Sequence, residues 1–148
     1  MMGTVKFALV SLVVAASFQT QKPMNFAGTW LPAGKPGSEM VVTQSDKQVT
    51  IDYVSAGKSV RKDEIVLDGA EHRRAIPTRV GEVVMLYRAA WESGRLVVIA
   101  DTAYPDGMKT NITETWSINP KGQLVIDSLE TGPGGKKIPN QMILTRKQ

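Results

Sequence analysis

The sequence predicts an all-β fold: an antiparallel up-and-down meander that closes into a β-barrel of about 8 to 10 strands. From Phe26 onward, apolar residues recur with a period of two, which is the period of a strand with one buried face. Gly, Pro, Asn and Asp interrupt this pattern at intervals of about ten residues, as turns do between short strands. No segment shows a convincing helical period.

The N-terminus has the features of a secretory signal peptide, predicted over residues 1–17. Lys6 precedes an apolar run over 7–16 that is shorter than the roughly 20 residues of a spanning helix. Small residues then offer a cleavage site. We expect a linker over 18–25, one domain over 26–148, and a secreted or periplasmic protein with no stable membrane anchor after cleavage. An uncleaved anchor or a buried first element is the alternative.

Composition narrows the class of protein further. The chain has 148 residues and no cysteine, so its domain must be held together by packing and strand pairing rather than by disulfides. The net charge of +4 is spread over alternating acids and bases. The nearest basic cluster, at 72–74 with Arg79, fits a solvated strand end better than a phosphate-binding stripe, and we expect no nucleic-acid partner.

The sequence of the first half of the domain predicts two hairpins. Residues 48–53 form the clearest strand, because Ile51 and Tyr53 share one face and polar residues occupy the other. Turn formers at 45–47 join it to a strand over 39–44.

A second hairpin is expected around Asp68-Gly69, a dipeptide that readily takes the positive φ angles of a two-residue turn. It would join strands over 61–67 and 71–76. Pro77 ends the second of these strands or places it at a sheet edge.

The second half repeats one pattern. Residues 87–99 and 114–126 each read as a strand carrying a tryptophan, a glycine-containing turn and an aliphatic strand, which predicts two more hairpins. A final strand is expected over 138–146. Both faces of 83–87 and 96–100 are apolar, so a loop, the N-terminal arm or a partner subunit is expected to cover their outer side.

Charged and aromatic residues in these strands indicate a candidate pocket. Glu114 shares a face with Ile112 and Trp116, and an inward carboxylate costs several kcal/mol unless it is paired, for which Arg88 is the candidate. The candidate ligand-binding residues are Tyr53, Tyr87, Arg88, Glu114 and Trp116. Alternatively, both charges are on the surface because of a β-bulge, and the rings simply fill the core.

Catalytic and metal sites are not predicted. His72 is the only histidine, and without cysteine or a second imidazole it cannot form a usual zinc site. No Gly-x-Ser-x-Gly elbow or comparable nucleophile signature is present. We therefore expect no enzyme activity, no metal and no cofactor.

The segment Phe26-Ala27-Gly28-Thr29-Trp30 resembles the opening of lipocalin-like (calycin) barrels, in which a Gly-x-Trp lies at the closed end. The resemblance implies that a basic side chain near the last strand packs over the tryptophan ring. Arg146 is in the matching place, so Gly28, Trp30 and Arg146 would form a structural plug. The chain also resembles a group of small, uncharacterised secreted bacterial proteins with lipocalin-like folds. This second resemblance is carried by the Gly-Thr-Trp segment together with residues 67–69, Trp116-Ser117 and residues 122–126.

The signal peptide, the strand meander, the Gly-Thr-Trp opening and the candidate pocket residues together predict a function. We expect an exported barrel that binds a small apolar or amphipathic ligand. The alternative is a non-enzymatic structural or protein-interaction module whose barrel is filled by side chains. The sequence does not identify a protein partner.

Overall fold

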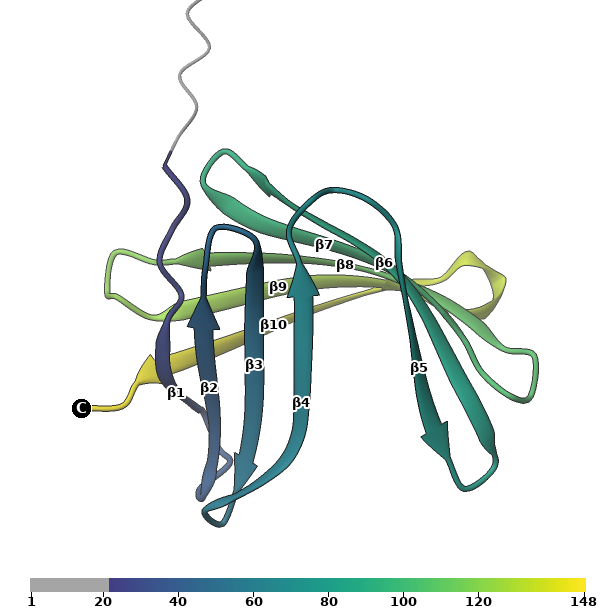
Figure 1. Cartoon of the computed structure of the whole chain (residues 1–148), viewed down its shortest axis with the longest axis horizontal. Coiled ribbons are helices and arrows are strands. Elements are labelled where there is room, and N and C mark those ends of the chain that lie inside the picture. Colours follow the sequence, from purple (N-terminus) through teal and green to yellow (C-terminus); the bar gives the residue numbers. More distant parts are fainter. Residues whose placement is uncertain (1–21) are drawn as a thin grey trace, which may run out of the picture.

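Ten antiparallel strands form one sheet in the computed structural model, which describes residues 22–148 (Figure 1). They are β1 (Gly28–Pro32), β2 (Ser38–Gln44), β3 (Gln48–Ser55), β4 (Lys58–Val66), β5 (His72–Thr78), β6 (Gly81–Glu92), β7 (Arg95–Ala103), β8 (Lys109–Ile118), β9 (Leu124–Thr131) and β10 (Lys137–Arg146). A 3₁₀ turn, Pro133–Gly135, is the one helical element of this part. The predicted all-β meander is confirmed.

The predicted signal peptide and the first residues of the linker lie outside the described residues. Between Lys22 and the C-terminus, no helix combines the length and the apolar composition needed to cross a membrane.

The first and last strands of the sheet pair with each other, and the sheet is open between two strands from the middle of the chain, β4 and β5. Strand β1 pairs with both β2 and β10, whereas β4 and β5 are the two edges, giving the order β4-β3-β2-β1-β10-β9-β8-β7-β6-β5. Closure into a complete barrel is therefore not confirmed. The prediction that Asp68-Gly69 forms a tight hairpin turn is wrong, since the strands on either side of it do not pair.

Local hydrogen bonds explain why the connection at 67–71 does not form a hairpin. The amide of Gly69 donates to the carbonyl of Ala89 at 3.0 Å, which fixes the loop to β6 rather than to β4. The side chain of Asp68 accepts from the amide of Ala70 at 3.0 Å and lies 2.8 Å from Nε2 of His72. These bonds stabilise a wider bend, so β5 leaves in a different direction from β4. Pro77 lies in β5, which is an edge strand as expected.

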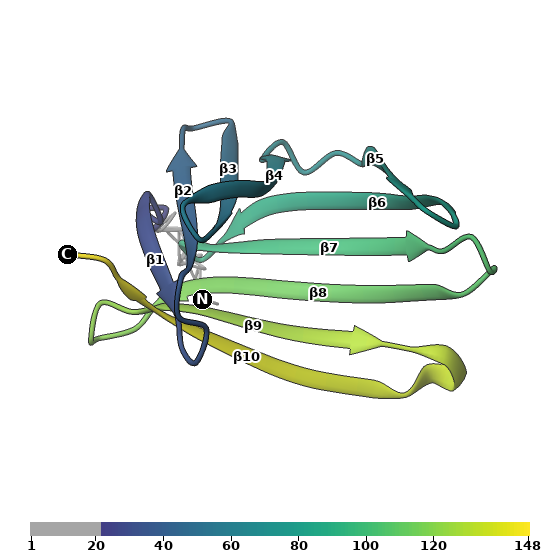
Figure 2. The same cartoon turned by 90° about the horizontal axis from the view of Figure 1, so that it is seen from below.

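The crossing of the two sets of strands leaves part of the inner face uncovered. In Figure 1 strands β1–β4 cross β8–β10 at a steep angle, and Figure 2 shows β6–β10 continuing well beyond them. The inner face of β6–β10 is therefore covered at one end only. On β10, the inner-face side chains of Ile138 and Met142 remain 48% and 38% exposed.

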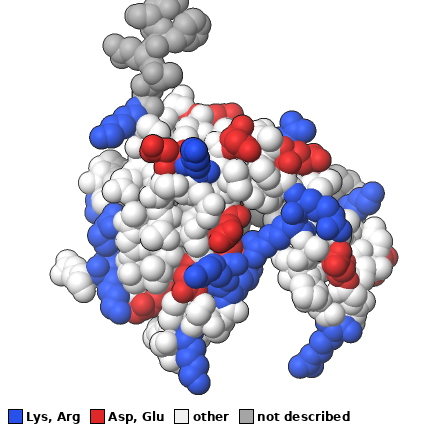
Figure 3. Space-filling model, in the orientation of Figure 1, with Lys and Arg blue, Asp and Glu red and all other residues white. Residues whose placement is uncertain are grey.

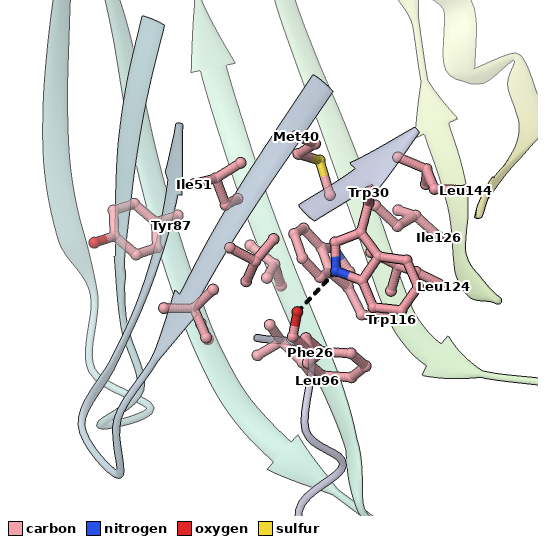
Figure 4. Packing of buried hydrophobic residues seen from close by; sticks show 14 of the residues in the cluster. Phe26, Trp30, Met40, Ile51, Tyr87, Leu96, Trp116, Leu124, Ile126 and Leu144 are labelled. Carbon is pink, nitrogen blue, oxygen red and sulfur yellow. Dashed lines mark hydrogen bonds between the residues drawn. The ribbon is translucent and has the colours of Figure 1, made fainter. Parts of the chain in front are cut away.

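Aromatic rings form the centre of the covered end (Figure 4). Phe26 is fully buried, stacks on Trp91 with ring centres 5.8 Å apart, and meets Trp116 edge-on at 5.9 Å. Its carbonyl accepts a 2.9 Å hydrogen bond from Nε1 of Trp30, whose ring is also fully buried. The segment before β1 is thus held in the core by both its ring and its backbone.

Arg146 lies over the outer side of the Trp30 ring, as the lipocalin resemblance implied. The two residues are direct partners in the β1–β10 register, and the guanidinium carbon lies 4.3 Å from the ring centre. The guanidinium also donates to the carbonyl of Ala27 at 2.9 Å. Gly28 leaves room for this group, because a Cβ there would collide with it and the residue adopts a φ of +143°. A guanidinium on an indole contributes about 0.5 to 2 kcal/mol.

Replacing Gly28 with alanine is expected to destabilise the protein more than replacing Gly37. Both positions have a positive φ, but a Cβ at Gly37 meets no atom within 4 Å. Each substitution incurs backbone strain of about 1 to 2 kcal/mol. Gly28→Ala also displaces the Arg146 guanidinium, which adds roughly 1 to 2 kcal/mol. Urea unfolding of both variants measures the difference, and equal losses would show that the contact between Arg146 and Trp30 is unimportant.

Candidate ligand-binding site

A cavity of about 100 Å³ lies on the inner face, between β3–β4 on one side and β6–β8 on the other. Its floor is apolar and is made by Ile51, Ile65, Met85, Val98, Ala100 and Ile112. Its polar lining consists of Tyr53, Arg61, Asp63, Glu64, Arg74, Tyr87 and Glu114. Strand alternation explains this composition, because each of these strands turns every second residue inward.

Three of the sequence-predicted residues come together here. Tyr53 from β3, Tyr87 from β6 and Glu114 from β8 all line the cavity. Trp116 lies next to it in the core and donates a 3.2 Å hydrogen bond from Nε1 to a carboxylate oxygen of Glu114. Of the two alternatives for Glu114, pocket or surface, the structure shows the pocket.

Arg88 is not part of this group. Its side chain is 63% exposed on the outer side of β6, and its guanidinium lies 3.6 Å from the carboxylate of Glu71. The expected pair between Arg88 and Glu114 does not form. The reason is geometric: Tyr87 and Arg88 are neighbours in one strand, so when the first points inward the second must point outward.

Sequence reasoning missed the charged cluster of Arg61, Asp63 and Arg74. Asp63 is only 6% exposed and forms ion pairs with both arginines. Arg61 donates from Nε to Oδ2 of Asp63 at 2.9 Å. The alternation of Arg61, Asp63 and Ile65 in β4 was a usable signal that Asp63 faces inward. The contribution of Arg74 was not predictable, because it comes from β5 across the opening of the sheet.

The charged neighbours decide the protonation of this cluster. Burial by itself raises the pKa of Asp63, but hydrogen bonds from Arg61 and Arg74 and their positive charges outweigh it, so the pKa lies below its usual value. Burial, with the nearby charge of Asp63, raises the pKa of Tyr53. The Tyr53 hydroxyl therefore stays protonated at neutral pH. The guanidinium carbon of Arg61 lies 4.7 Å from the Tyr53 ring centre.

Side chains take the place of a neighbouring strand along the edge of β4. The Tyr87 hydroxyl accepts from the amide of Val66 and donates to the carbonyl of Glu64, both at 3.3 Å. Farther along, Arg74 donates to the carbonyl of Lys62 at 3.0 Å. Backbone groups that would otherwise lack partners are thus satisfied without strand pairing. The opening between β4 and β5 is thus bridged by side chains.

The outer mouth of this opening is strongly charged. Figure 3 shows basic and acidic side chains close together in the hollow between the two parts of the molecule. Lys62, Glu64, Arg73 and Arg74 line a hollow of about 340 Å³ at this point, together with Val66 and Tyr87. Tyr87 and Arg74 line both this hollow and the inner cavity, so only a few side chains separate the cavity from solvent.

A second inner-face hollow, of about 380 Å³, extends over β8–β10. It shares Ile112 and Glu114 with the cavity, so the two spaces adjoin. Two larger hollows, of about 520 and 510 Å³, lie elsewhere, over β8–β10 and over β6–β9. Neither of them contains the charged cluster.

Within residues 22–148, no group of three or more His, Asp or Glu side chains is placed to hold a metal ion. His72 lies 2.8 Å from Asp68, and its ring centre is 5.5 Å from that of Tyr87. No protein-family model matches the chain, and no curated protein matches it.

Stability is expected to depend on pH through Asp63. Because its pKa is lower in the folded state, Asp63 stabilises the fold above its unfolded pKa of about 3.9, and this contribution is lost as pH falls through the folded value. Asp63→Asn should cost about 1 to 3 kcal/mol at pH 7 and progressively less below pH 4. Urea unfolding at pH 7, 5 and 3 measures this difference.

The control is Glu92→Gln, which removes an exposed carboxylate at the end of β6. It should leave stability nearly unchanged at every pH. A loss for Asp63→Asn that is the same at pH 3 and pH 7 would contradict the role assigned to its ionised form.

Proposed function

We propose that this protein is an exported carrier that binds a small amphipathic molecule on the inner face of its sheet. The observation that carries the proposal is the cavity itself. It combines an apolar floor with two tyrosines, two arginines and three acidic residues. Binding sites for small molecules have this composition, in which apolar surface provides affinity and a few polar groups set orientation.

The opening between β4 and β5 supports the proposal, because it offers a ligand a route to the interior. In a fully paired barrel, access through the wall would require breaking backbone hydrogen bonds between strands. Here only side chains, those of Arg74 and Tyr87, bridge to the edge of β4. A ligand entering here would have to displace these side chains but would break no hydrogen bonds between paired strands.

The size of the cavity limits what it can hold. A volume of about 100 Å³ is room for about three water molecules at roughly 30 Å³ each. That is enough for a compact end group but not for a whole lipid. The adjoining hollow of about 380 Å³ would take the remainder of the ligand, so both spaces contribute to one site.

The lipocalin-like resemblance and the predicted signal peptide agree with this role. Members of that superfamily with the Gly-x-Trp opening enclose small ligands, and here Trp30 and Arg146 adopt the arrangement that the resemblance implies. Export would place the carrier in the periplasm or outside the cell.

Filling the cavity should abolish ligand retention. Ala100 lies in its floor and is 3% exposed, so Ala100→Leu adds apolar volume there without introducing a polar group. After incubation with a lipid extract, native mass spectrometry should show a bound compound on the wild type and at least tenfold less on this variant. Ala90→Leu, on the other face of β6, is the matched control and should retain the compound. Equal retention by both variants, or none by the wild type, would contradict the proposal.

A second candidate function is a protein-interaction module. It is favoured by the two unpaired edge strands and by the exposed apolar side chains of Leu86, Ile99 and Leu129. Unpaired strand edges can add a strand from a partner. Light scattering and chemical crosslinking test this candidate. A strict monomer with no crosslinked partner at high concentration would count against it.

A further inference from the structure

The hollow over β8–β10 combines apolar walls with two carboxylates. Ile112, Ile126, Ile138 and Met142 provide the apolar surface, and Glu114 and Glu130 provide the charge. Ile138 and Met142 are 48% and 38% exposed, although their strand positions put them on the inner face. Among residues 22–148, nothing covers this apolar surface fully, so it is available to a ligand.

Glu114 and Glu130 lie on the same face of neighbouring strands. In the β8–β9 register Ile112 faces Glu130 and Glu114 faces Ser128, so Glu114 and Glu130 are diagonal neighbours on the same face. Diagonal neighbours of this kind have Cα atoms about 7 to 8 Å apart. A single positive group between them would interact with both.

No cation of the described chain occupies that position. The hollow is lined by no Lys or Arg side chain, and neither carboxylate takes part in an ion pair among residues 22–148. The guanidinium groups of Arg61 and Arg74 form ion pairs with Asp63, while the charge of Glu114 acts on Arg61 without an ion pair and contributes to raising its pKa. Glu114 accepts one hydrogen bond, from Trp116, which leaves its second oxygen available.

We propose that this hollow binds an amphipathic cation, a primary or quaternary ammonium group carrying an aliphatic chain. This inference rests on the proposed function, since it assigns the ligand class of the same inner face. The ammonium group lies between Glu114 and Glu130, and the chain packs on Ile126, Ile138 and Met142. Charge complementarity selects the cation, because a carboxylate or sulfate in the same place would meet two negative charges on a half-buried surface.

The test compares three probes with the same ten-carbon chain: decyltrimethylammonium, decanoate and decyl maltoside. Isothermal titration calorimetry on the full-length protein is done below the critical micelle concentration of each probe. We expect the cation to bind at least tenfold more tightly than decanoate. The positive net charge of the protein, +4, would favour the anion, so a preference for the cation has to come from the site.

Neutralising the carboxylates should remove this preference. Glu114→Gln combined with Glu130→Gln is expected to weaken cation binding at least tenfold and to leave decyl maltoside binding unchanged. Glu130→Gln alone should weaken it about threefold and does not disturb the hydrogen bond between Trp116 and Glu114, so it is informative if the double variant does not fold. The matched control, Asp127→Asn, removes a carboxylate from the outer face of β9 and should have no effect.

The outcomes separate the two proposals. If decanoate binds as tightly as the cation, or if neither glutamate variant weakens cation binding, the assignment of a cationic ligand is overturned while the proposed carrier function stands. If none of the three probes binds, both are overturned.

Discussion

The join between the two ends of the sheet is the constraint on which the rest of the structure depends. Strand β1 has only five residues, yet it pairs with β2 on one side and β10 on the other. Burial of Trp30, its hydrogen bond to the carbonyl of Phe26 and the guanidinium of Arg146 over its ring hold this short strand in place. Because of that join, β1–β4 fold over one end of β6–β10 and create an inner face.

The opposite side of the sheet shows the complementary feature. Where β4 and β5 separate, Tyr87 and Arg74 satisfy backbone groups of β4, and Asp63 balances the two arginines. Three backbone groups of this sheet edge thereby have side-chain partners in place of a neighbouring strand. The same side chains form the margin of the cavity, so the feature that leaves the sheet open also creates the candidate site.

Sequence patterns predicted the strands better than the relations between distant strands. The hairpin of 39–44 with 48–53, the two tryptophan hairpins and the edge position of Pro77 are all observed. Each depends on residues close in sequence. The hairpin predicted at Asp68-Gly69 failed because a bond from Gly69 to Ala89, twenty residues away, fixes the loop elsewhere. Similarly, alternation placed Glu114 on an apolar face, but only the arrangement of the strands shows which face of β6 is inner.

The sequence alone determined the fold class, the approximate strands and three of the residues that line the cavity, because a period of two and the chemistry of turn residues are local properties of a chain. Tertiary structure decided where the sheet opens, that Arg88 faces outward, and that Arg74 reaches Asp63 from another strand. These outcomes depend on how strands far apart in sequence curl and cross, and periodicity carries no information about that.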